Sequence, residues 1–98
     1  MPASHTRYGD IASLTENKLS FDFFHEEYTS YASGDRTIQI PKSNFKKITS
    51  TNVVVGVFAY ADVKYDIKAY WGSDCVNLLI KKTNEIIDIP VNIIVFYV

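Results

Sequence analysis

The chain has 98 residues, a formal net charge of −1, 47% hydrophobic residues and 14% aromatic residues. This length indicates one domain with a modest core, and the composition is too apolar for a disordered chain. Ten Lys and Arg stand against eleven Asp and Glu, so the chain lacks the basic excess that nucleic-acid binding requires. We therefore expect a folded domain that does not bind nucleic acid.

A single cysteine, Cys75, cannot form an internal disulfide, which argues against a disulfide-stapled secreted miniprotein. The first ten residues lack the apolar segment of a signal peptide. The most apolar stretch, residues 86–98, is too short for a membrane helix and contains Asp88, Pro90 and Asn92. These features predict a soluble protein made in a reducing cytoplasm, with no membrane insertion.

In chain order, residues 1–17 are predicted to be a polar N-terminal lead-in and residues 18–98 a single β domain. Lys18 to Phe24 predicts a first strand, because apolar side chains recur at every second position on one face: Leu19, Phe21 and Phe23. The polar segment from His25 to Asp35, which contains two tyrosines, predicts a loop.

Two further strands are predicted in the middle of the chain. Arg36 to Ile40 alternates and ends at Pro41, which cannot donate to a β-ladder. Val53 to Ala61 is almost continuously apolar and β-branched, which predicts a strand buried on both faces. Gly56 within it predicts a bulge or a close backbone approach. Phe58 of this strand, like Phe21 and Phe23, is most simply assigned to the core.

The last third of the chain predicts three strands. The first has a single inward face made of Val63, Tyr65, Ile67, Ala69 and Trp71. Gly72-Ser73-Asp74 predicts a turn, and the next strand alternates through Val76, Leu78 and Ile80. After a turn at residues 83–85, residues 86–98 predict a closing strand with an irregularity at Pro90.

Short strands separated by turns, with no long helix, predict an all-β fold. The expected architecture is an antiparallel β-sandwich or small Greek-key barrel of about six to eight short strands. Strands 53–61 and 86–98 carry more apolar residues than one small sandwich needs inside. We predict that a second copy covers the surplus face, and that the chain is a homo-oligomer. The alternative is that residues 11–24 cover it.

No catalytic or phosphate-binding motif is present. Cys75 directly follows a turn, and an inert packed thiol is its simplest interpretation. The adjacent residues His25, Glu26 and Glu27 point to alternating faces in an extended chain and cannot easily converge on one metal ion. We therefore predict a non-enzymatic protein with no catalytic residue, metal or cofactor. A small enzyme or enzyme inhibitor that uses His25 or Cys75 stays open as a third hypothesis.

Aromatic rings beside acidic or amide groups suit sugar rings, because the ring stacks on C–H faces while the polar groups bond hydroxyls. Parity places Trp71 and Tyr65 on the inward face, so Tyr70 is the better exposed contact. The segment from Tyr28 to Tyr31 is the second candidate for an exposed contact. The candidate ligand-binding residues are Tyr70, Tyr28, Tyr31, Glu26, Glu27, His25, Trp71 and Asp74.

Three segments carry a family resemblance: Thr37 to Lys42, Ile48 with Val53 to Val57, and Ile86 to Val98. Over residues 36–98 the chain resembles the C-terminal head, or knob, domain of phage tail-fibre and receptor-binding proteins. The resemblance implies a trimeric tip on the virion tail that attaches to a host cell-surface ligand, which is a glycan or a protein, and we expect a saccharide. The alternative is a structural or assembly subunit whose apolar faces only mediate oligomerisation.

Overall fold

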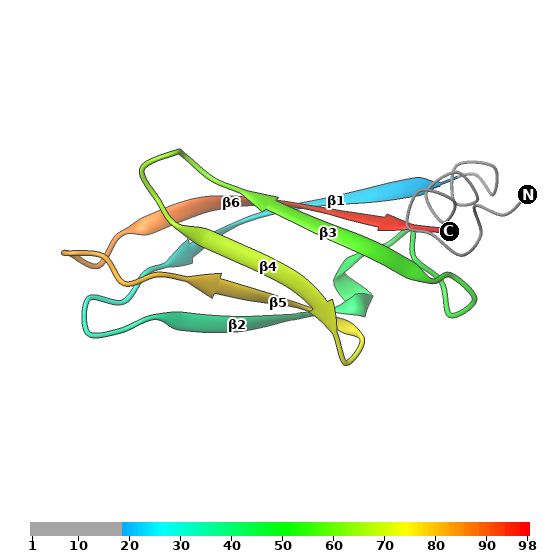
Figure 1. Ribbon diagram of the computed structural model, residues 1–98, viewed down its shortest axis with the longest axis horizontal. Coiled ribbons are helices and arrows are strands. Elements are labelled where there is room, and N and C mark those ends of the chain that lie inside the picture. The colour runs from blue at the N-terminus through cyan, green and yellow to red at the C-terminus, as the bar shows by residue number, and fades with distance from the viewer. Residues whose placement is uncertain (1–18) are drawn as a thin grey trace, which may run out of the picture.

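A computed structural model describes residues 19–98, and the described part of the chain is all-β (Figure 1). The predicted lead-in over residues 1–17 lies outside the described residues. Besides a short 3-10 turn, η2 (Lys42–Asn44), the described elements are β1 (Ser20–Thr29), β2 (Arg36–Pro41), β3 (Val54–Tyr60), β4 (Ile67–Gly72), β5 (Cys75–Ile80) and β6 (Asp88–Tyr97).

The strands form two three-stranded antiparallel sheets, ordered β1-β6-β3 and β2-β5-β4. In Figure 1 the sheets lie as two layers, and the chain passes between them after β1, β2, β3 and β5. Consecutive strands pair directly at β4 and β5, through a tight turn in which Ser73 and Asp74 both have positive φ, 55° and 57°. The predicted all-β antiparallel sandwich of short strands is thus confirmed.

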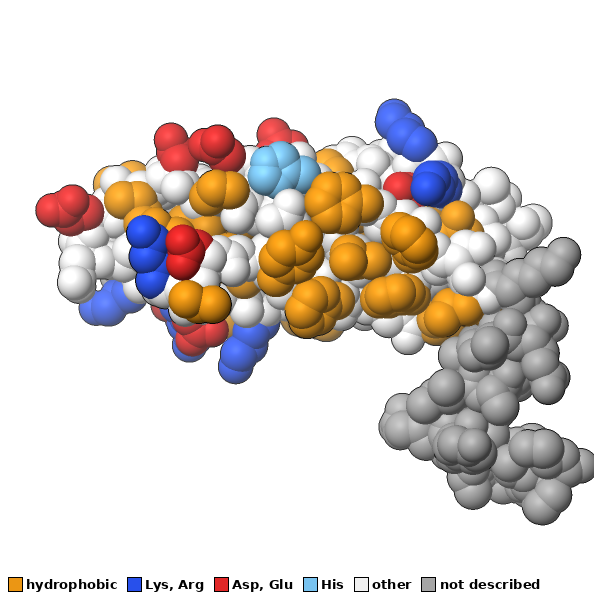
Figure 2. All heavy atoms as spheres, turned by 90° about the horizontal axis from the view of Figure 1, so that it is seen from above, with side chains coloured by type: hydrophobic (Ala, Val, Ile, Leu, Met, Phe, Trp, Pro, Cys, Tyr) orange, Lys and Arg blue, Asp and Glu red, His pale blue; other side chains and the backbone are white. Residues whose placement is uncertain are grey.

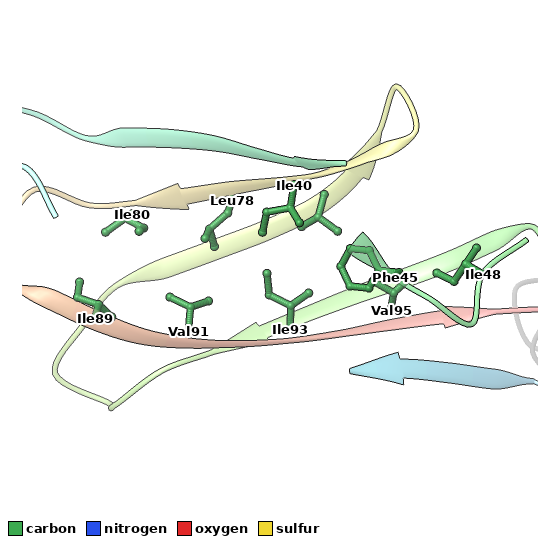
Figure 3. Packing of buried hydrophobic residues seen from close by; sticks show 10 residues of the cluster. Ile40, Phe45, Ile48, Leu78, Ile80, Ile89, Val91, Ile93 and Val95 are labelled. Atoms are coloured by element: carbon green, nitrogen blue, oxygen red, sulfur yellow. The ribbon is translucent and has the colours of Figure 1, made fainter. Parts of the chain in front are cut away.

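The core lies between the two layers (Figure 3). Alternate side chains of the central strands β6 and β5 point toward each other, as period-two strands require. Phe45 and Ile48, from the segment between β2 and β3, pack into the same cluster. The buried cluster consists of Ile40, Phe45, Ile48, Val76, Leu78, Ile80, Ile89, Val91, Ile93 and Val95. Each of these side chains is at most 8% exposed.

The bulge predicted at Gly56 is confirmed. Val54 pairs with Tyr97 and Gly56 pairs with Phe96, so β3 has one extra residue, Val55, that has no partner of its own on β6. Pro90 is accommodated inside β6, where the pairing with β3 has already ended at Asn92 and β1 is the neighbouring strand. Its missing N–H therefore falls where β6 has a strand on one side only.

Two boundaries predicted from local pattern are wrong. The segment from His25 to Asp35 is not a loop throughout, because β1 continues to Thr29 and stays in register with β6 up to the pair Thr29–Asp88. Polar and charged residues in this segment are compatible with an edge strand. The strand predicted from Val63 begins only at Ile67, and Val63 is fully exposed in a turn closed by the bond from Tyr65 N–H to the Asp62 carbonyl oxygen.

The assignment of Phe21, Phe23 and Phe58 to the core is also wrong. Their side chains are 56%, 50% and 55% exposed. The β1-β6-β3 sheet buries one face against the other sheet, and no part of residues 19–98 covers its outer face. For the same reason β3 is not buried on both faces within the described part of the chain.

Candidate functional site

The outer face of the β1-β6-β3 sheet carries a group of apolar side chains from all three strands. Figure 2 shows hydrophobic side chains gathered over this sheet. We call this group the aromatic face, and its members are Phe21, Phe23, Val55, Phe58, Tyr60, Ile94 and Phe96.

Strand register makes the aromatic face continuous. Phe23 on β1 and Phe58 on β3 both pair with Ile94 on β6, so these three side chains form one row across the sheet. The rings of Phe58 and Tyr60 stack, with centroids 5.8 Å apart and planes 29° apart. Contiguous apolar surface of this kind on a folded protein typically marks an interaction site.

Opposite charges border the aromatic face at its two ends. At one end, the Lys47 ammonium lies 5.7 Å from the centroid of the Phe21 ring. At the other end are the exposed carboxylates of Glu27 and Asp88, which pair in register with Pro90 and Thr29. The Thr29 hydroxyl donates to Asp88 Oδ1 at 2.9 Å. The face is therefore polarised along the strand direction.

His25 lies at the border between the aromatic face and this acidic end. Its ring Nδ1 lies 2.9 Å from Asn92 Oδ1, and because an amide oxygen only accepts, Nδ1–H is the donor. Glu27 shares the outer side of β1 with His25, whereas Glu26 has the opposite parity. Within residues 19–98 no three His, Cys, Asp or Glu side chains form a group that could hold a metal ion.

The two candidate tyrosines beyond Glu27 have different environments. Tyr28 is half-buried against the core, and this burial, followed by the charge of Glu26, raises the pKa of its phenol, while Arg36 acts in the opposite direction. Tyr31, in the loop after β1, is 46% exposed and lies under the Arg36 guanidinium, 5.2 Å from ring centroid to Cζ. Of the two, Tyr31 is the more accessible.

The outer face of the β2-β5-β4 sheet is polar. Gln39, Asn77 and Tyr70 are neighbours in register across its three strands, and we call them the polar row. Tyr70 is 64% exposed, while the Asn77 amide donates to the Gly72 carbonyl oxygen at 3.3 Å. Trp71, the next residue, is half-buried against the core, as its parity predicted.

A shallow depression of about 340 Å³ adjoins the polar row. Asp74 lines it from the tight turn between β4 and β5, together with Gln39, Pro41, Ser73 and Cys75. The Cys75 thiol is buried and donates to the Gly72 carbonyl oxygen at 3.0 Å. Tyr70 and Asp74 thus belong to one hairpin, Tyr70 on the strand β4 and Asp74 in the turn that follows it.

The structure therefore divides the predicted site residues among separate places. His25, Glu26 and Glu27 lie on β1, whereas Tyr70 and Asp74 belong to the other sheet and its hairpin. His25 and Cys75 also lie on different sheets and are not brought together. The sequence predicted a surplus apolar face on strands 53–61 and 86–98, but the contribution of β1 was missed because Phe21 and Phe23 were assigned to the core.

Comparisons of the chain with protein-family models, curated proteins and solved structures found no match. Among residues 19–98 no helix has the length and apolar character needed to cross a membrane. The aromatic face and the polar row are therefore the observations on which a function can be proposed.

Proposed function

We propose that this chain is a non-enzymatic binding and assembly module that docks its aromatic face onto an apolar protein surface. The observation that carries the proposal is the row Phe23–Ile94–Phe58 with its flanking rings, open on one sheet face. Four half-exposed rings present about 400 Å² of apolar area. Removing that area from water gives about 10 kcal/mol of favourable free energy. The cost of the translational and rotational freedom lost on association must be subtracted from this value.

The placement of the titratable residues supports a non-enzymatic role. An acid–base or nucleophilic site needs its groups within hydrogen-bond reach of one another. His25 and Cys75 lie on different sheets, and the Cys75 thiol is buried and bonded to a backbone carbonyl oxygen. The aromatic face, by contrast, offers contact area without reactive groups.

A receptor-binding head is the second candidate function, and the polar row favours it. The exposed Tyr70 ring, with Asn77 and Gln39 beside it and Asp74 nearby, offers a stacking face and hydrogen-bonding groups to a saccharide. In this proposal the module is a trimeric tip on a virion tail, and several weak sites act together on a host cell-surface glycan or protein.

Dye binding tests the assembly role. The double variant Phe23→Thr/Phe58→Thr keeps strand-forming residues while removing two exposed rings. We expect it to lose most of the bis-ANS fluorescence and most of the retention on a hydrophobic-interaction column. The control is Tyr70→Thr, which removes a ring that is 64% exposed from the opposite sheet. Equal losses in both variants, or none in the double variant, would contradict the assembly role.

A glycan array tests the receptor role. Purified chain and the Tyr70→Ala variant are compared, with Tyr60→Ala as the control because it truncates a tyrosine on the other outer face. We expect Tyr70→Ala to weaken saccharide binding about tenfold, since it removes the stacking ring. An array on which wild type binds nothing, or on which both variants bind like wild type, rejects a saccharide site at the polar row.

A further inference from the structure

We infer that the aromatic face is occupied by a second copy of this chain, packed sheet to sheet with its strands antiparallel around a twofold axis. The inference rests on the proposed assembly role and adds the identity and orientation of the partner. In the complex, Glu27 of one copy lies against Lys47 of the other, and the same contact occurs twice.

Charge complementarity sets this orientation. Phe21, Phe23, His25 and Glu27 follow one another on the outer side of β1, so Glu27 lies about 13 Å beyond Phe23. Lys47 lies over Phe21, on the opposite side of Phe23. A twofold axis that crosses the strands near Phe23 therefore exchanges the basic and acidic ends. A parallel arrangement would place like charges together, which disfavours it.

The same axis makes the apolar contacts self-complementary. The row Phe23–Ile94–Phe58 spans all three strands at the middle of the face, so each copy presents this row to its own counterpart. An isologous interface requires such self-matching. The twist of the two sheets does not prevent this packing. Stacked sheets in proteins lie about 10 Å apart with their strands within about 30° of alignment.

The available area indicates a reversible complex. The four exposed rings contribute about 400 Å² per copy, and Val55, Ile94 and Phe96 extend the contact beyond them. The total stays near the lower bound for specific interfaces, so we expect a dissociation constant on the order of 10 μM.

Two observations favour face-to-face packing of copies over other occupants. At the edge of β1, the inward Asp22 carboxylate accepts the Lys47 backbone N–H, so a chain segment already lies against that edge and hinders strand addition. Residues 1–18 contain four large apolar side chains, those of Met1, Tyr8, Ile11 and Leu14. This is a poor match for the seven apolar side chains of the aromatic face.

Light scattering coupled to size-exclusion chromatography tests the inference over a concentration series. We expect wild type to pass from monomer to dimer, Phe58→Glu to weaken association about 100-fold, and Tyr70→Glu on the other sheet to behave like wild type. Glu27→Lys and Lys47→Glu should each weaken it about tenfold, because symmetry repeats each clash. The double variant Glu27→Lys/Lys47→Glu should recover most of the affinity.

Carbodiimide cross-linking gives a second measurement that needs no substitution, should Lys47→Glu disturb the fold beside Asp22. In a mixture of isotope-labelled and unlabelled wild-type chain, we expect a mixed-isotope peptide that joins Glu27 to Lys47. Absence of that cross-link in a sample that is dimeric by light scattering overturns the antiparallel orientation.

The inference and the proposed function fail in different ways. A chain that is monomeric at every concentration, yet loses bis-ANS binding in Phe23→Thr/Phe58→Thr, overturns self-association and leaves the aromatic face to a different protein. A trimer overturns the twofold arrangement. A dimer that is insensitive to Phe58→Glu, together with unchanged dye binding in the double variant, overturns both proposals.

Discussion

The Asp22 carboxylate accepts the backbone N–H of Lys47 at 3.0 Å, and this contact ties the segment after Phe45 to the edge strand β1. Asp22 is 8% exposed, and its other oxygen accepts the N–H of Phe23 at 2.8 Å. An inward charge on an edge strand disfavours pairing with another edge. Here the same charge also fixes the backbone of Lys47, which borders the aromatic face.

Replacing Asp22 by Ala should lower the free energy of unfolding by about 1–3 kcal/mol, because it leaves the partly buried N–H groups of Lys47 and Phe23 without an acceptor. Urea denaturation measures the change. Asp66→Ala, in the exposed turn between β3 and β4, is the control and should change stability by less than about 0.5 kcal/mol. Equal effects of the two substitutions would reject the structural role of Asp22.

Ser30 joins the loop that follows β1 to the loop that precedes β6. It is fully buried, its N–H donates to the Ile87 carbonyl oxygen at 2.8 Å, and its hydroxyl accepts the Ile87 N–H at 3.2 Å. Ser30→Ala should cost about 1–2 kcal/mol and accelerate amide exchange at Ile87. Ser43→Ala, an exposed residue of η2, is the matched control. Unchanged exchange at Ile87 would contradict the prediction.

Asp35 makes the free energy of unfolding depend on pH in the acidic range. The backbone N–H of Lys82 donates to its carboxylate at 2.9 Å, and this bond, with Lys81 nearby, holds the pKa of Asp35 below its ordinary value of 3.8. A lowered pKa in the folded state adds stability above the unfolded-state pKa, and that stability is lost as pH falls through the folded-state pKa. The stability difference between wild type and Asp35→Asn should therefore be largest at neutral pH and vanish below the folded-state pKa. Urea midpoints across this range measure it, and a difference independent of pH would contradict the assignment.

Two substitutions in the turn between β4 and β5 should stabilise the fold. Ser73 and Asp74 have φ values of 55° and 57°, a conformation for which Asn-Gly is the preferred pair in a two-residue hairpin. Ser73→Asn/Asp74→Gly should raise the free energy of unfolding by about 1 kcal/mol. The control Asp66→Gly places glycine where φ is not positive and should lower stability slightly. A thermal melt distinguishes the two directions, and stabilisation by both variants would contradict the explanation.

The strands with clean local patterns were predicted well. The strand predicted over Arg36 to Ile40 is β2, which extends one residue further to Pro41. The strand predicted through Val76, Leu78 and Ile80 is β5. The second half of β1 was not predicted, because its strand state comes from pairing with β6, far away in the chain. Local sequence carries no signal for such a partner.

Period two also identifies two faces of a strand without deciding which one is inside. On β1 the two sets are Phe21 with Phe23 and Asp22 with Phe24, and hydrophobicity alone favours the wrong one. Asp22 points inward because the Lys47 N–H satisfies it, a contact that exists only in the folded chain. Tyr70 was placed correctly, because its neighbour Trp71 is the larger apolar partner for the core.

The extra residue at the bulge of β3 also bears on how such a chain could evolve. Beyond the bulge, Val57 and Ala59 pack against the core while Phe58 and Tyr60 point outward. A one-residue slip in a strand exchanges its two faces, but the bulge already absorbs one residue between Val54 and Val57. An in-frame loss of the Gly56 codon would therefore leave Val54 opposite Tyr97 and Val57 opposite Val95, with regular alternation between them. Such a deletion would straighten β3 and keep Phe58 and Tyr60 on the outer face, so the aromatic face could arise in, or persist through, a chain without the bulge.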